Sequence, residues 1–452
     1  MNVPDRFSAP PLKLALLSRC RPEEALPERF WETARRVARP DDELVPLCGV
    51  PTADDLRNFD AALVFGACGT NPLAAPLAAA ELPCMAVEPY LVFHTYHAAL
   101  YREIEQRGGT VLPAVDPEQI ATSLQAVRAR KLLSGLRLLV VYVTDDERRA
   151  TEIALFTAGA RERLGVEIVS RSVEELVERA ATYTDAAADA ELQRWYAEIL
   201  EGPGEMSAEH MRQVARLYLA ERDLLAETGA VGITVDDIGG FLVIPQPLVM
   251  PNVTYGPLVA DGFLACEEGD VETLASELLL QVGLGAAPTM SNIYLSFRDR
   301  FDALASHTDY TWEMEQADAL QCLADDTLTA AHFSTSGVLP PCMMEEARYR
   351  VRETLPSWPG QSMISSTPHL GPVVMARLTP DAAGVHLVPA QINHLGLGDQ
   401  YGWYRGRYFL QIANARDFAA RCLFQHYALG PENAQAAVLD TLVEKLLRLT
   451  AV

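Results

Sequence analysis

The chain has 452 residues, with 37 lysines and arginines against 61 aspartates and glutamates, which gives a formal net charge of −24. A protein this acidic lacks the basic surface with which nucleic-acid and anionic-membrane binders displace counterions, so neither partner is expected. Hydrophobic residues make up 49% and charged residues 22% of the chain, values that are typical of folded globular proteins and exclude extensive disorder.

The cysteines and the N-terminal segment indicate in which cellular compartment the protein resides. Eight cysteines are spread over the chain without a CxxC pair, a usage typical of reduced thiols in a cytosol. No apolar run is as long as a membrane span, and residues 1–11 lack a basic stretch followed by a long apolar one. We therefore expect a cytoplasmic protein without a membrane partner.

Residues 11–134 alternate short apolar runs with helical patterns. The apolar runs predict buried strands at Leu12–Leu17, Ala61–Gly66, Cys84–Val87 and Thr110–Leu112. Helices are predicted around Pro22–Arg39, Phe93–Arg107 and Pro117–Leu133. This alternation is typical of a parallel sheet covered by helices on both faces, so the region is interpreted as an N-terminal α/β domain.

Residues 135–300 show the same alternation of apolar runs and helical patterns, which predicts a second α/β domain. Strands are expected at Leu136–Val143, Val166–Ser170 and Ala230–Val235, and helices at Glu147–Leu164 and Ser207–Thr228. In the last helix Ser207 suits the N-cap, and Gly229 suits the position after the C-terminus.

Residues 301–452 show mainly strand patterns and are interpreted as a C-terminal β-rich domain. Gly371–Leu378 and Gly384–Pro389 predict an antiparallel hairpin, and Tyr401–Ile412 predicts an aromatic strand. The pattern of Pro431–Leu449 predicts a final helix. We therefore expect strands to dominate this part of the chain, with helical additions.

Carboxylates gather where the apolar run Phe263–Cys266 ends and a helix begins. Glu267, Glu268, Asp270 and Glu272 follow that run directly. Carboxylates held by a rigid element suit a divalent cation or proton transfer. The alternative is plain helix capping, because acids stabilise the positive end of a helix dipole.

Two histidines supply a second kind of ligand. His332 follows an apolar run, and His426 lies in Leu-Phe-Gln-His-Tyr-Ala-Leu-Gly. Carboxylate with imidazole suits Mn²⁺ or Mg²⁺, although a single histidine is more often structural. The chain contains no P-loop, G-x-S-x-G or H-E-x-x-H motif, so nucleotide hydrolysis, serine hydrolysis and zinc proteolysis have no support.

Four short segments between about residues 260 and 430 resemble known motifs. Residues 265–271, ACEEGDV, resemble an A-C-E-x-D segment, and residues 326–333, DTLTAAHF, resemble N-T-L-x-x-W-H-C. Residues 371–378, GPVVMARL, resemble G-P-V-T-L-A-R-L, and residues 425–430, QHYALG, resemble H-H-x-A-L-x-x-G. In this order the segments resemble the L-fucose isomerase / L-arabinose isomerase superfamily, in particular its fucose-isomerase-like proteins.

The resemblance implies a fold and an activity. It implies two Rossmann-like, doubly wound α/β domains (11–134 and 135–300) and a C-terminal β-rich, barrel-like domain (301–452) in a homo-oligomer with active sites near subunit contacts. Family members interconvert aldoses and ketoses with Mn²⁺ held by a Glu, an Asp and a late His. The resemblance places the Glu at Glu267 and the His at His426, and puts His332 near the sugar.

The chain departs from the family at the second carboxylate. The family segment F-A-D-L corresponds to Thr289-Met-Ser-Asn292-Ile-Tyr, so Asn292 stands in place of the Asp. An amide oxygen can contact a cation, but it carries no charge and cannot act as a base. Three hypotheses follow: a metal-dependent sugar isomerase or epimerase that tolerates Asn292, a family-derived enzyme with altered chemistry in specialised metabolism, or a catalytically silent sugar-binding protein.

Overall fold

The structure is a computed structural model, and it divides into two compact units. The N-terminal unit comprises Ser8–Gly135, Glu162–Gly165 and Ala437–Val452, and the large unit comprises Met1–Phe7, Leu136–Arg161 and Val166–Ala436. The structure describes residues 5–18, 25–66, 71–87, 97–114, 116–204, 206–236, 249–294, 317, 320–321, 323–331, 338–353, 362–366, 369–395, 408–421, 426–432 and 438–449.

The N-terminal unit contains a four-stranded parallel sheet in the order β2-β1-β3-β4. Its strands are β1 (Lys13–Ser18), β2 (Glu43–Cys48), β3 (Ala61–Phe65) and β4 (Cys84–Val87). Its helices are α1 (Glu28–Val37), α2 (Ala53–Leu56), α3 (Ala74–Ala79), α4 (Ala98–Gln106), α5 (Pro117–Leu133) and α16 (Leu439–Arg448), with the short 3₁₀ helix η2 (Asn71–Leu73). The predicted strand Thr110–Leu112 is only a bridge between Val111 and Cys84.

Alternate residues of this sheet enter two separate apolar clusters. Leu14 and Leu16 of β1 pack with α1 and α5, whereas Ala15 and Leu17 pack with α2, α3 and α4. Because successive strand side chains point to opposite faces, both faces of the sheet are covered by helices, as the alternating pattern predicted.

The large unit begins with a second four-stranded parallel sheet, in the order β6-β5-β7-β8. Its strands are β5 (Arg137–Tyr142), β6 (Glu167–Ser172), β7 (Gly232–Val235) and β8 (Leu264–Cys266). Its helices are α6 (Glu147–Leu164), α7 (Val173–Ala180), α8 (Asp185–Glu198), α9 (Ala208–Thr228), α11 (Tyr255–Ala260) and α12 (Val271–Leu284), with the 3₁₀ helices η1 (Asp5–Phe7) and η4 (Pro251–Val253). Ser207 caps α9 and Gly229 ends it with φ 67°, as the sequence predicted.

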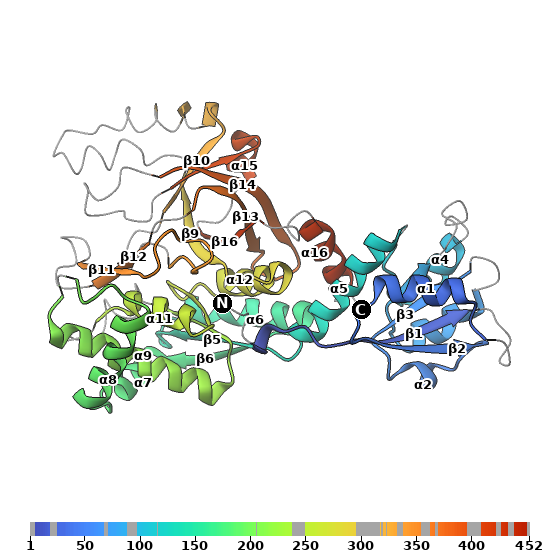
Figure 1. Cartoon of the computed structure of the whole chain (residues 1–452), viewed down its shortest axis with the longest axis horizontal. Helices are drawn as coiled ribbons and strands as arrows, with labels where there is room; N and C mark the ends of the chain where they lie inside the picture. The colour runs from blue at the N-terminus through green and yellow to red at the C-terminus, as the bar shows by residue number, and fades with distance from the viewer. Residues whose placement is uncertain are drawn as a thin grey trace. The chain divides into compact units, whose positions relative to one another are not determined.

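An antiparallel barrel completes the large unit (Figure 1). It closes in the order β10-β15-β14-β13-β16-β9. Its strands are β9 (Thr289–Tyr294), β10 (Thr327–Ala331), β13 (Gly371–Leu378), β14 (Val385–Leu395), β15 (Tyr408–Ile412) and β16 (His426–Pro431). A separate antiparallel pair of strands, β11 (Arg350–Glu353) with β12 (Ser362–Ser365), and the helix α15 (Ala415–Arg421) accompany it.

Helix α12 joins the parallel sheet to the barrel. It contacts β5, β7 and β8 on one side and β9, β13 and β16 on the other (Figure 1). Residues all round α12 are buried, as expected for a helix between two layers. The backbone N–H of Leu378 on β13 donates a 2.8 Å hydrogen bond to Ser276 Oγ on α12.

The β13–β14 turn packs tightly against α6 at Gly159. A Cβ atom at this position would lie 2.1 Å from the carbonyl oxygen of Asp381, which belongs to the turn. The close approach of the two backbones therefore requires a glycine.

Two segments differ from the sequence-based interpretation. Of the predicted helix Pro431–Leu449, Pro431 is the last residue of β16 and Leu439–Arg448 form α16; residues 433–437 lie outside the described part of the chain. This helix belongs to the N-terminal unit, where it contacts α5 and Lys445 Nζ donates a 2.6 Å hydrogen bond to Pro113 O. Asn292, assigned to the second α/β domain, lies on β9 and therefore in the barrel.

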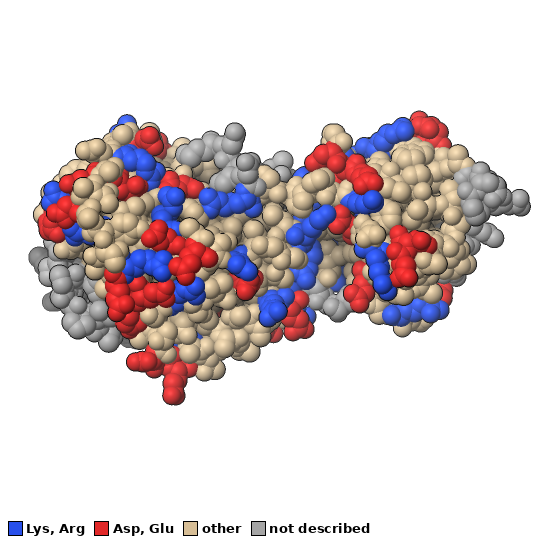
Figure 2. Space-filling model, turned by 90° about the horizontal axis from the view of Figure 1, so that it is seen from below, with Lys and Arg blue, Asp and Glu red and all other residues tan. Residues whose placement is uncertain are grey.

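The surface mixes both signs of charge. In the view of Figure 2, basic and acidic side chains lie next to one another without a broad basic area. Among the described residues, Arg179 pairs with Glu175 and Glu227 in this manner. Within the same part of the chain, no helix is both long enough and apolar enough to cross a membrane.

Candidate functional site

Strand β8 delivers Glu267 to the carboxyl end of the second parallel sheet, the edge where ligands of such sheets bind. A sharp turn follows, in which Glu268 and Gly269 have φ of 59° and 62°. Three hydrogen bonds fix this turn: Arg149 Nη2 donates to Glu268 O at 2.6 Å, Gly269 N to Val235 O at 2.9 Å, and Thr234 Oγ1 to Glu267 O at 3.2 Å. The carboxylates are thus presented by a well-tied backbone.

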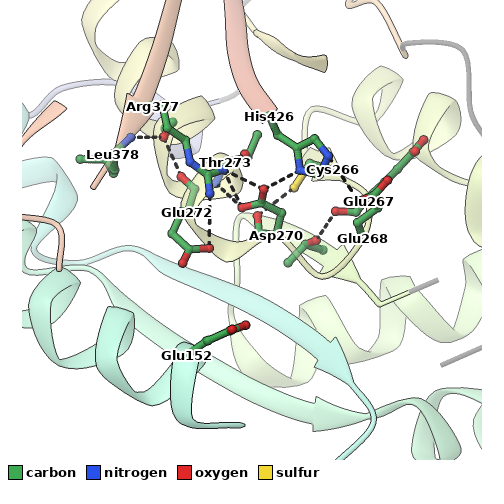
Figure 3. A network of polar contacts seen from close by, with 12 residues as sticks. Glu152, Cys266, Glu267, Glu268, Asp270, Glu272, Thr273, Arg377, Leu378 and His426 are labelled. Atoms are coloured by element: carbon green, nitrogen blue, oxygen red, sulfur yellow. Dashed lines mark hydrogen bonds and ion pairs between the residues drawn. The ribbon is translucent and has the colours of Figure 1, made fainter. Parts of the chain in front are cut away.

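Asp270 is the centre of a buried polar network (Figure 3). As the N-cap of α12, its Oδ1 accepts a 2.8 Å hydrogen bond from Thr273 N. Arg377 Nη1 on β13 donates to both of its oxygens, at 2.8 and 2.7 Å. The capping interpretation is therefore correct for Asp270, but the same carboxylate also joins the sheet side of the unit to the barrel.

His426 lies between two carboxylates. Its Nδ1 is 2.8 Å from Asp270 Oδ2, and its Nε2 is 3.2 Å from Glu268 Oε2 (Figure 3). A histidine whose Nδ1 is held by a carboxylate has a fixed ring orientation, with Nε2 directed at a defined point. His426 is thus aimed at the turn that carries Glu267 and Glu268.

The partners of Asp270 and His426 decide their charges. Burial would raise the pKa of Asp270, but Arg377 and the hydrogen bond from His426 hold it well below its usual value. Burial would lower the pKa of His426, yet the hydrogen bond to Asp270 and the charges of Asp270 and Glu268 raise it. The partners therefore favour the charged form of Asp270 and shift the pKa of His426 upward.

Glu267 behaves in the opposite way. Its side chain is 5% exposed. Burial, reinforced by the negative charge of Glu268, raises its pKa well above the usual value, and the nearby His426 only partly opposes this. Glu267 therefore tends to hold a proton while Asp270 does not, an asymmetry of the kind that separates acid and base roles.

Asn292 lies directly opposite His426 on the paired strands β9 and β16. Side chains of such cross-strand partners point to the same face of the sheet and lie close together. Asn292 is fully buried, and neither its Oδ1 nor its Nδ2 has a hydrogen-bond partner in the described part of the chain. An unpaired buried amide is costly, which makes it a natural contact for a polar ligand.

The structure thus brings three of the four predicted site residues, Glu267, Asn292 and His426, to one place. His332 lies outside the described residues. Among the described residues, no group of three or more His, Cys, Asp or Glu side chains has an arrangement that could hold a metal ion.

Sequence reasoning missed the functional setting of Arg377 and Glu277. Arg377 is 8% exposed within the apolar strand β13, and a buried arginine in such a strand requires an acidic partner, which was an available signal. Glu277 on α12 is 1% exposed; burial, with the charges of Asp270 and Glu267, raises its pKa. Glu277 lies two helical turns after Asp270 on the same helix, so its spacing from the acidic cluster was a signal that could have marked it.

Comparisons with known proteins add little. No protein family model and no curated protein matches the chain. Among solved structures, a protein described as a two-component system response regulator/GGDEF domain protein matches with a TM-score of 0.22 and 12% identity, over 57% of this chain and 91% of that chain. A similarity at this level carries no argument about fold or function.

Proposed function

We propose that this chain is a metal-dependent sugar isomerase or epimerase of the fucose-isomerase-like type, which interconverts an aldose and a ketose through an enediol. The observation that carries the proposal is the convergence of Glu267, from the end of β8, with Asn292 and His426, from two paired barrel strands. These are the positions at which the sequence resemblance places the metal ligands.

The residues present fit a hard divalent cation. Glu267 and Asn292 offer oxygen and His426 offers nitrogen, a donor set that suits Mn²⁺ or Mg²⁺. No described residue pairs with the amide of Asn292, which is consistent with a missing polar contact. A bound cation would polarise the carbonyl of an open-chain sugar. Since Asn292 is uncharged, we expect weaker cation binding than with three charged or imidazole ligands.

Different residues of the site would have different roles in the reaction of the sugar. Glu267 would carry a proton between C1 and C2, because burial and the charge of Glu268 raise its pKa and so favour a carboxyl that can hold the transferred proton. Asp270 would fix the ring of His426, and Arg377 would hold Asp270. Asn292 would donate or accept a hydrogen bond with a sugar oxygen. In this proposal His332 lies near the sugar.

The proposal extends to the whole protein. The two parallel sheets would be Rossmann-like, doubly wound domains, and the barrel would be the β-rich C-terminal domain. We expect a cytoplasmic homo-oligomer with active sites near subunit contacts and a small-molecule sugar as substrate.

Solvent deuterium exchange tests the reaction directly. An enediol mechanism replaces the proton at C2 of an aldose with deuterium in D₂O, which proton NMR detects. We expect exchange with at least one member of a panel of pentoses, hexoses and deoxyhexoses when Mn²⁺ is added, and none with Glu267→Gln. Absence of exchange across the panel, with Mn²⁺ or Mg²⁺ present, would overturn the proposal.

Asn292 favours a second candidate, a family-derived protein with altered chemistry or a silent sugar-binding protein. Its amide lacks the charge and basicity of the family's carboxylate. Such a protein would bind a sugar, measured by calorimetry, without exchanging its C2 proton. Exchange in the wild-type chain would exclude this alternative.

A further inference from the structure

A pocket lies at the opposite end of β8 and α12 from Glu267. It is lined by residues at the start of β8, the end of α12, η1 and the segment 340–342, and its volume is about 470 Å³. Such a volume is within the range of small-molecule sites. Asp270 and Gln281 are eleven residues apart on α12, or roughly 16 Å at the helical rise, so this pocket is distinct from the candidate site.

The walls of this pocket are mainly apolar. Phe7 from η1, Phe263 and Leu264 at the start of β8, and Pro340 and Pro341 provide rigid aromatic and aliphatic surface. Burying an apolar ligand surface here is favourable by the hydrophobic effect, and the fixed walls lower the entropic cost of binding. The walls therefore suit a small aromatic or branched aliphatic body.

One amide supplies a polar contact in the pocket. Gln281 lines it and is 3% exposed, and its side chain makes no hydrogen bond with the described residues. A side-chain amide has two N–H donors and one acceptor oxygen, which a bound ligand can contact from inside the pocket. A ligand with an oxygen at this position would satisfy the amide N–H groups.

A guanidinium that makes no ion pair or hydrogen bond within the described structure lies beside the pocket. Arg6 stacks on the ring of Phe263, a lining residue, with 4.0 Å between its Cζ and the ring centroid. Arg222 also faces that ring, at 5.6 Å. Burial and the charge of Arg222 lower the pKa of Arg6, and the charge of Asp261 only partly opposes them.

The acidic residue of the pocket is already neutralised. Asp261 accepts hydrogen bonds from Arg194 Nη1 at 2.9 Å, from Arg222 Nη1 at 2.7 Å and from the hydroxyl of Tyr218. Arg194 also pairs with Glu191. Three guanidinium groups thus face two carboxylates in this cluster, and the positive charge left over is that of Arg6.

We propose that this pocket binds a small carboxylate with an apolar, aromatic or branched body. The carboxylate pairs with Arg6 and accepts a hydrogen bond from Gln281, while the body packs against Phe7 and Phe263. This site is independent of the proposed isomerase activity, and its test needs no turnover.

Binding of 3-phenylpropionate to the full-length protein tests this inference, with 3-phenylpropanamide as the neutral ligand of the same shape. Calorimetry is expected to show saturable binding of the carboxylate below about 10 mM, and at least about tenfold weaker binding of the amide, because a charge-assisted contact is lost. Arg6→Met is expected to remove this preference, and Gln281→Leu to weaken binding of the carboxylate.

Cys342 gives a second readout, because it lines the same pocket and is a free thiol. Alkylation of Cys342 by iodoacetamide, followed by peptide mass spectrometry, is expected to slow when 3-phenylpropionate is bound. Ala286→Phe, which fills the pocket, is expected to abolish binding, and its melting curve checks that it folds. No saturable binding, equal binding of acid and amide, or unprotected Cys342 would each overturn the proposal.

Discussion

Two buried carboxylates of the large unit, Asp270 on α12 and Glu221 on α9, lie in similar burial but hold opposite charge states. Asp270 has Arg377 and His426 as partners, which keep its pKa well below the usual value. Burial raises the pKa of Glu221 to about 8, and only the hydroxyl of Thr254 opposes this shift. The comparison shows that partners, and not burial alone, decide whether an interior acid is charged.

Glu267 combines both situations and gives the largest expected effect. It has a raised pKa like Glu221, but it lies beside His426. We expect Glu267→Gln to lower kcat/KM for the sugar identified by deuterium exchange by about 10³-fold, the contribution of a general acid–base group. The melting temperature is expected to stay within a few degrees of wild type. Unchanged kcat/KM would remove Glu267 from the mechanism.

Removing Arg377 should leave Asp270 as a buried carboxylate without its main cationic partner, as Glu221 is. Arg377→Met leaves a buried carboxylate without its main cation, and such a change costs about 3–5 kcal/mol of unfolding free energy. Urea denaturation at pH 7 measures it. The control is Arg350→Met, because Arg350 pairs with Glu201 on the surface and we expect a loss below about 1 kcal/mol. Equal losses would contradict the comparison.

Glu221 should make stability depend on pH. The folded protein holds the Glu221 proton up to about pH 8, whereas the unfolded chain releases it near its ordinary value of 4.5. Stability from this group is therefore complete below about pH 4.5 and is lost as pH rises to about 8. The loss is roughly 3–5 kcal/mol, from about 1.4 kcal/mol per pKa unit.

Glu221→Gln isolates this contribution. Urea denaturation at pH 5 and pH 8 should show that the variant gains stability relative to wild type at the higher pH. Glu198→Gln, a change on the exposed end of α8, should leave the difference between the two pH values as in wild type. A wild-type pH dependence that persists in Glu221→Gln would assign it to another group.

Asn292→Asp is expected to have the smallest effect. It places a carboxylate opposite His426 and should strengthen Mn²⁺ binding by about tenfold, which corresponds to about 1.4 kcal/mol. The rise in melting temperature on adding Mn²⁺ measures the change, and Asn292→Leu, which removes the oxygen, is the matched control. Equal metal response in all three proteins would mean that residue 292 does not contact the cation.

Much of the α/β part could be predicted because its signals are local. The apolar runs of β1, β3, β4 and β5 and the caps of α9 are written into short stretches of sequence. The position of the final helix could not be predicted in this manner. Its contact with α5 joins residues more than three hundred positions apart, and no local pattern encodes such a pairing.

In the candidate site, too, the locally encoded features could be predicted and the long-range contacts could not. The acids after β8 were visible as a cluster, and His426 was visible as a candidate ligand. That Asn292 and His426 are cross-strand partners depends on the register of β9 and β16, which only the folded barrel defines. Missing β16 as a strand also hid that His426 and Arg377, which both contact Asp270, lie on neighbouring strands.

Gly159 limits how freely this sequence can diverge. With the Asp381 carbonyl 2.1 Å from where a Cβ would be, even alanine would push the β13–β14 turn away from α6. Arg377 lies on β13 just before that turn, so the displacement would reach the strand that pairs with Asp270. A homologue with any side chain at this position would need a compensating change in the turn, and the two positions should vary together during evolution.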